Sequence, residues 1–378
     1  MSMENHKPSK DLFVPVDREA EEQHEIGRPS LSFWKDSMLR LRKNKAAMIG
    51  LVLLIIIAFM AIFGPYMNEY TANEQDLSQA KVPAKVEGLG WLGLDGTLSQ
   101  IEEGETVEAA REDALARFSN DEENTEINVL NDGSDGSQAR VEAIHDPYAA
   151  KDINNNFWFG TDGLGRDQWT RVWEGTRISL YIALLAAAID MVIGVAYGGI
   201  SAYYGGRVDN YMQRFIEIIT GIPNLVVVVL MILIMDPGIL SITIALVITG
   251  WIPMARIVRG QVLKLKNQEF VLASQTLGSS DGRVIRKHLV PNVTGLIIIN
   301  TMFTIPSAIF FEAFLSFIGL GLPTPTASLG TLIDEGFKSL QIYPFILFWP
   351  ALVLSALMIA FNVLADGLRD AFDPKMRE

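Results

Sequence analysis

The stretch EFVLASQTLGSSDGRVIRKHLVPN, residues 269–292, lies between two long apolar runs and combines helix-forming, turn-forming and basic residues. Its first half, which ends at Leu277, predicts a short amphipathic helix. Gly278 follows as the C′ residue of that helix, where a positive φ angle costs glycine little. The two serines and Asp281 after it offer N-cap chemistry for a second helix, and Pro291 suits the first turn of the next apolar helix. The stretch therefore predicts a helix, a glycine turn and a second helix that leads into an apolar span.

Six segments are long and apolar enough to cross a bilayer, whose hydrocarbon core of about 30 Å needs roughly 20 helical residues. Four contain no charged residue, one contains Asp190, and one contains Glu217 near its start. The six segments are residues 46–67, 178–204, 215–235, 238–255, 289–311 and 342–365. The fourth is short and by itself also fits a buried core helix, but its five neighbours favour a membrane span. The sequence predicts an all-α membrane protein with six transmembrane helices.

The positions of lysine and arginine set the orientation of these spans, because basic loops stay in the cytoplasm. Basic residues cluster before the first span, between the fourth and fifth spans, and after the sixth. With six spans these clusters all fall on one side of the membrane. We therefore expect the N-terminal arm 1–45 and the tail 366–378 to be cytoplasmic, and residues 68–176 to lie outside.

An acidic block, residues 68–174, separates the first two spans and holds 23 acids against eight bases. The whole chain of 378 residues carries 44 acids and 31 bases, so the remainder is nearly neutral. A nucleic-acid-binding protein needs a basic face, which excludes nucleic acid as a partner. Runs of like charge favour solvent, and we expect residues 79–146 to form a peripheral extracytoplasmic insertion with a helix at 106–118. The chain has no cysteine, so neither disulfides nor thiolate metal sites are available.

Acidic residues within the spans are candidate functional groups. Asp190 lies deep in the second span. It is either a residue of a transport path or proton relay, or a residue that is hydrogen-bonded to a neighbouring helix. Glu217 and Glu312 lie nearer to helix ends, and we expect both to reach or pair at the membrane boundary. Asp190 is therefore the one deep acid that we expect.

The stretch 269–292 resembles a known family through Glu269, Ala273, Ser274, Leu277, Gly278 and Pro291. The family is the membrane-spanning permease subunits of ATP-binding-cassette importers. Their cytoplasmic signature reads Glu-Ala-Ala, three residues, Gly, and a proline thirteen positions after that glycine, and the spacing from Gly278 to Pro291 fits. Leu272 stands at the usual glutamate position, and a serine replaces the second alanine. The resemblance implies that residues 268–291 form a coupling loop that contacts an ATPase.

A second stretch, FGTDGLGRD at residues 159–167, lies just before the second span. It is similar to the stretch at that place in the second permease of oligopeptide and dipeptide importers. The residues that carry this similarity are Gly160, Thr161, Asp162, Gly165, Arg166 and Asp167. Residues 313–321 and 366–374 also look like that subunit, whereas about 79–146 does not. The two acids could also suggest a calcium loop, but they lack its alternating oxygen ligands, which favours a capping turn above the helix.

The resemblance implies a permease subunit of an ATP-driven oligopeptide importer in a bacterial cell membrane, with a permease core at residues 177–365. It implies five kinds of partner: a second homologous permease, two ATP-binding subunits that carry ATP and magnesium, an extracytoplasmic peptide-binding protein, a peptide substrate and membrane lipid. No stretch matches the phosphate-binding loop G-x-x-x-x-G-K-[ST], so we expect no cofactor, no metal and no enzymatic activity in this chain itself. The alternatives are an importer of dipeptides or nickel in the same family, and a membrane anchor or sensor with an acidic ligand-binding outer domain.

Overall fold

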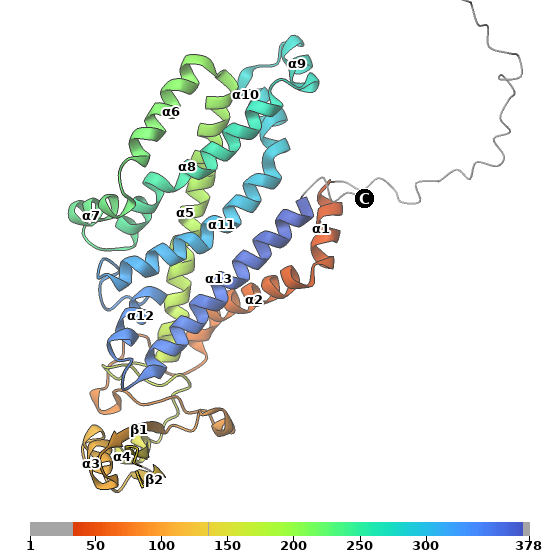
Figure 1. Ribbon diagram of the computed structural model, residues 1–378. Helices are drawn as coiled ribbons and strands as arrows, with labels where there is room; N and C mark the ends of the chain where they lie inside the picture. Colours follow the sequence, from red (N-terminus) through yellow and green to blue (C-terminus); the bar gives the residue numbers. More distant parts are fainter. Residues whose placement is uncertain (1–32, 135, 373–378) are drawn as a thin grey trace, which may run out of the picture.

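A computed structural model describes residues 33–134 and 136–372 as an elongated, mostly helical molecule (Figure 1). Long helices form its middle. The short helices α9 (Glu269–Thr276) and α10 (Asp281–Val284) lie at one end, and a small lobe that contains strands lies at the other. Residues 1–32 of the expected N-terminal arm and residues 373–378 of the expected tail lie outside the described residues.

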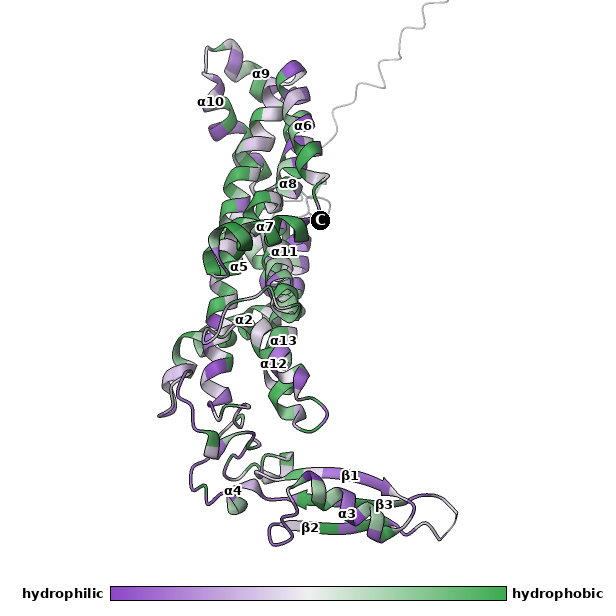
Figure 2. Cartoon of the chain, turned by 90° about the vertical axis from the view of Figure 1, so that its left-hand side faces the viewer, coloured by the Kyte–Doolittle hydropathy of each residue, from purple (hydrophilic) through white to green (hydrophobic). Residues whose placement is uncertain are grey.

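Five helices among the described residues are long and apolar enough to cross a membrane, and a bent pair adds a sixth if it counts as one span. Each of the five overlaps one of the predicted apolar runs. They are α2 (Lys45–Phe63) with the 3-10 turn Gly64–Tyr66, α5 (Gln168–Tyr204), α8 (Ile239–Leu265), α11 (Val290–Phe317) preceded by the π-helical turn Ile285–Leu289, and α13 (Pro344–Phe372). Figure 2 shows mainly hydrophobic residues along these helices, whereas hydrophilic and hydrophobic residues mix at the two ends of the molecule.

The third predicted span, residues 215–235, is not one helix. Its place is taken by α6 (Gly206–Thr220) and α7 (Asn224–Met235), which are bent by 78° across a short break. The break contains Gly221 and Pro223. Proline has no N–H to continue the helix, and its ring disfavours the helical region for the residue before it. Residues 215–235 therefore do not form one continuous helix, although the apolar run continues through the break and the bent pair can count as one span.

The most extensive contact between two helices of the bundle joins α5 to α8. It depends on Gly194 and Gly198, which lie four positions apart on α5. A Cβ atom on Gly198 would overlap the carbonyl oxygen of Ala255, and one on Gly194 would overlap Met254. Small residues at this spacing let membrane helices approach closely. The same close approach buries Asp190, one turn earlier on α5, against α8.

The lobe contains a three-stranded antiparallel sheet, so the expectation of an all-α protein is wrong there. The strands are β1 (Leu98–Gly104), β2 (Thr125–Asn131) and β3 (Ala139–His145), in the order β1-β3-β2. Along β3, buried and more exposed residues alternate, as a strand with one covered face requires. The helix α3 (Val107–Arg117), which the sequence predicted, covers the sheet, and Ala110, Phe118 and Val141 share its core.

The remaining elements are short. α12 (Leu329–Lys338) precedes α13 and begins with a capping box, in which the Thr331 amide donates to Ser328 Oγ (3.2 Å) and the Ser328 amide donates to Thr331 Oγ1 (2.8 Å). The others are α1 (Phe33–Lys43), α4 (Pro147–Ala150) and the 3-10 turns Leu77–Gln79 and Gly90–Leu92.

Candidate functional site

The predicted coupling loop folds as a helix, a glycine turn and a second helix. Gly278 has a φ angle of 81°, which is the left-handed conformation that was predicted for it. The Gly278 amide donates to the Gln275 carbonyl (2.9 Å) and the Ser279 amide donates to the Ser274 carbonyl (3.1 Å). This pair of bonds is a Schellman motif, which satisfies the last carbonyl groups of α9. Ser280 occupies the N-cap position of α10, but its side chain makes no capping bond.

The loop is fastened to the end of α5 by polar contacts and by one buried side chain. Tyr203 donates its hydroxyl proton to Asp281 Oδ1 (2.7 Å), and Gln275 Nε2 donates to the Tyr203 oxygen (3.2 Å). Lys266 Nζ donates to the carbonyl of Ala202 (2.7 Å). Val271 is fully buried in a cluster with residues of α5, α8 and α11. The loop is therefore packed onto three long helices.

The loop also exposes apolar side chains. Leu277 is 86% exposed, and Phe270 and Leu272 are each more than 40% exposed. Of the other predicted loop residues, Glu269, Ala273 and Pro291 are exposed and Ser274 is partly buried. A rigid element with an apolar outer face has the form of a docking surface for another protein.

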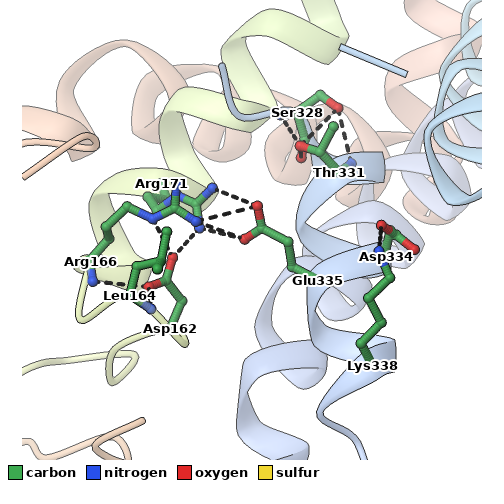
Figure 3. Close-up of polar contacts among 9 residues, drawn as sticks. All are labelled: Asp162, Leu164, Arg166, Arg171, Ser328, Thr331, Asp334, Glu335 and Lys338. Carbon is green, nitrogen blue, oxygen red and sulfur yellow. Dashed lines mark hydrogen bonds and ion pairs between the residues drawn. The ribbon is translucent and has the colours of Figure 1, made fainter. Parts of the chain in front are cut away.

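At the other end of α5, a buried network joins the stretch 159–167 to α12 (Figure 3). Arg166 Nε contacts Asp162 Oδ2 (2.6 Å), and Arg171 Nη1 contacts Glu335 Oε2 (2.6 Å). Arg171 also pairs with Asp162, and Arg166 with Glu335. The two arginines and Asp162 are almost fully buried. The two positive and two negative side chains neutralise one another here. This pairing matters because an unpaired buried charge costs much free energy.

Asp167 is the N-cap of α5, as the capping interpretation predicted. Its Oδ2 accepts from the Thr170 amide (2.8 Å) and from Asn68 Nδ2 (2.8 Å). Burial raises the pKa of the Asp167 carboxyl, against the lowering effect of these hydrogen bonds. Thr161 Oγ1 accepts from the Val82 amide (2.9 Å), so the stretch is also tied to the segment after α2.

Gly160 and Gly165 both have positive φ angles in this stretch. A Cβ atom on either would overlap a backbone oxygen, that of Val82 or that of Asp76. The six motif residues thus connect the start of α5 to α12 and to the segment after α2. The described residues, 33–134 and 136–372, contain no group of three or more acids or histidines that could hold a metal ion.

Asp190 faces a cavity of ≈410 Å³ between four helices, α5, α7, α8 and α11. Asp190 is 4% exposed, and its Oδ1 atom has no hydrogen-bond partner. Asn224, Thr249 and Asn300 also line this cavity. Within residues 33–134 and 136–372, no hydrogen bond joins Asp190 to a neighbouring helix, and such a bond was one of the two interpretations of this residue.

Comparison with known proteins identifies the family. A family model described as the binding-protein-dependent transport system inner membrane component matches residues 192–378, and one for the N-terminal transmembrane domain of oligopeptide transport permease C matches residues 32–84. The chain is 41% identical to the oligopeptide transport system permease protein OppC of Bacillus subtilis (strain 168), over 98% of each chain. The chain belongs to this permease family. The family that the two motifs predicted is confirmed.

Two further relatives of the permease match over most of their length. The dipeptide transport system permease protein DppC of Bacillus subtilis (strain 168) is 39% identical over 99% of this chain and 96% of its own. OppC of Escherichia coli (strain K12) is 33% identical over 92% of each chain. The alignments with the Bacillus relatives run through residues 79–146, where the sequence motifs alone gave no resemblance.

The structure corrects the prediction for a second acid of the permease. Glu312 on α11 is fully buried inside the protein, so its side chain does not extend to the surface of the bundle. It accepts hydrogen bonds from Ser179 on α5 (3.0 Å) and from Ser316 on its own helix (3.0 Å). Glu217, in contrast, is exposed and pairs with Arg214 (2.7 Å). Among the described residues of the long helices, Asp190 is therefore not the only buried acid.

Sequence reasoning also missed Arg171 and Glu335 as members of the network around Asp162. Arg171 lies one turn into α5 after the quoted motif, and Glu335 is 164 residues away from it. The sequence did contain one signal for Arg171. It lies in the first turns of a helix that continues as an apolar run, and a cation next to such a run needs a partner.

Proposed function

We propose that this permease is the second membrane subunit of an ATP-driven oligopeptide importer. The support is the match over nearly the whole chain to relatives named as oligopeptide and dipeptide permeases. In this proposal the chain pairs with a homologous permease, and together they enclose the path of the peptide. Two ATP-binding subunits supply the energy with ATP and magnesium, and an extracytoplasmic binding protein delivers the peptide.

The loop between α8 and α11 is the proposed contact with one ATPase subunit. In the proposed orientation this loop and the two ends of the chain lie in the cytoplasm, because all three regions are rich in lysine and arginine. The exposed Leu277, Phe270 and Leu272 fill a groove on the ATPase, while the buried Val271 ties the loop to the long helices. A motion of the ATPase then reaches the bundle through packed contacts, which coupling between two conformations requires. The lobe with the sheet and α12 lie on the outer side.

Uptake by the purified importer tests this function. The chain is reconstituted in vesicles with its partner permease, both ATPase subunits and the binding protein, and the uptake of a labelled pentapeptide is followed with and without ATP. Uptake that needs both ATP and this chain supports the proposal. Uptake of nickel ions without uptake of any peptide contradicts it.

Dipeptides are the second candidate substrate, because the match to the dipeptide permease is almost as close. A labelled dipeptide in the same vesicles separates the two. A membrane anchor or sensor is not favoured, since the relatives are named as permeases and the loop has the form of a docking element.

A further inference from the structure

The cavity beside Asp190 lies in the middle of the helical bundle. Asp190 stands 22 residues after the start of α5, and Asn224 is the first residue of α7, where the bent pair α6–α7 breaks. Broken helices near the centre of a membrane protein often mark the place where a substrate binds. The volume of ≈410 Å³ is within the range of small-molecule sites, roughly 300–1,000 Å³.

The carboxylate of Asp190 is held in this cavity without a counter-ion. No ion pair joins it to any residue in the described ranges 33–134 and 136–372, and its Oδ1 accepts no hydrogen bond. Gly250 on α8 makes room for it, because a Cβ atom at that position would overlap the carboxylate oxygens. An ionised carboxylate in such surroundings is costly unless a cation pairs with it.

Three polar side chains of the cavity that lie on α11 offer acceptor atoms, and each also donates one hydrogen bond within its own helix. Asn300 Nδ2 donates to the carbonyl of Leu296 (2.8 Å), Thr304 Oγ1 to that of Asn300 (2.9 Å), and Ser307 Oγ to that of Phe303 (2.9 Å). The amide oxygen and the two hydroxyl oxygens keep lone pairs for a ligand.

A proline in α8 leaves one more acceptor at the cavity. Pro253 lies inside α8 and has no N–H, so it cannot bond the carbonyl of Thr249 four residues earlier. Both residues line the cavity. A site with one carboxylate and several neutral acceptors suits an ammonium group, which has three donors and no acceptor. A divalent metal would need more charged ligands than this single acid.

We propose that this cavity binds the α-ammonium group of a peptide in transit, with Asp190 as its counter-ion. This inference rests on the proposed peptide import. The α-ammonium group is shared by peptides of every sequence, so a subunit that passes varied peptides can recognise it without regard to side chains. Asp190 and the acceptors of α8 and α11 then form a subsite for the free amino terminus.

A comparison of free and N-acetylated peptides tests the subsite. The full importer is reconstituted in vesicles, and the uptake of labelled tetraalanine and of N-acetyl-tetraalanine is measured for the wild type and for Asp190→Asn. We expect about a tenfold loss for the free peptide, the size of a lost charge-assisted hydrogen bond, and little change for the acetylated peptide. The binding protein is the same in both complexes, so its own preference cancels when the two uptake ratios are compared.

Two more variants serve as controls for this test. Gly250→Ala favours the helix but puts a methyl group where the carboxylate lies, so it should cause the same selective loss. Glu312→Gln changes a buried acid outside the cavity and should leave the ratio between the two peptides as in the wild type.

Three outcomes overturn the proposal: unchanged uptake of both peptides by Asp190→Asn, an equal fall for both, or loss of peptide selectivity in Glu312→Gln as well. An equal fall would mean that Asp190 has a structural or proton-carrying role. If the wild-type complex imports neither peptide, the proposed function fails instead, and that result is distinct from the other three.

Discussion

Replacing Gly278 by valine tests whether the shape of the loop matters for coupling. Its φ angle of 81° is in the region that glycine adopts freely, whereas a side chain there costs roughly 1–2 kcal/mol. A Cβ atom at Gly278 would meet no other atom within 4 Å, so the cost comes from the backbone alone. A penalty of this size lowers the ratio of formed to unformed turn by about 5- to 30-fold.

Gly282 offers a matched control in the same loop. It lies in α10, its φ angle is not positive, and a Cβ atom there would also meet nothing within 4 Å. We measure peptide uptake and peptide-stimulated ATP hydrolysis in vesicles for Gly278→Val and Gly282→Val. The first should lose most of both activities while it remains in the membrane and paired with the second permease, and the second should keep them. Equal uptake by the two variants would refute the reasoning and make the loop a simple connector.

Two further predictions concern the opposite end of the molecule. Glu335→Gln leaves Arg171 without its partner on α12. The free energy of unfolding should fall by an amount that approaches the about 3–5 kcal/mol of a broken buried pair, reduced by the partial exposure of Glu335. Thermal unfolding in detergent measures this loss, and the control Lys338→Gln, on the exposed pair with Asp334, should cost less than about 1 kcal/mol. Burial lowers the pKa of His145 in β3, against the raising effects of Asp121 and Asp146. The unfolded lobe therefore binds more protons than the folded lobe, and the stability of the lobe should fall as the pH drops below about 6.5. Hydrogen exchange of the β3 amides at pH 7 and pH 5 checks this, and His145→Gln should remove the difference.

The apolar runs predicted most of the helical bundle, because an apolar segment long enough to cross a bilayer is a local property of the sequence. The break between α6 and α7 was missed since hydropathy sums over Gly221 and Pro223 without sensing the backbone. The sheet was missed because its strands mix acids with apolar residues, so only the alternation along β3 carried the signal.

The polar contacts of the site were hard to predict for a different reason. The turn at Gly278 is determined by neighbours in the sequence and was predicted. Glu312 is buried against Ser179, which is 133 residues away, and Arg171 pairs with Glu335 at a similar separation. Such partners are brought together by helix packing, and no local pattern describes it.

The length of α5 has a mechanical consequence. This helix of 37 residues is about 55 Å long, and both of its ends are clamped, one by the Arg171 ion pairs and the other by the Tyr203 hydrogen bonds. An unbroken helix of this length acts as a lever, so a tilt of about 5° around its midpoint displaces each end by about 2 Å in opposite directions. In the proposed coupling, a push on the loop at one end would therefore move α12 at the far end in the reverse sense, without any change in the internal structure of the helix.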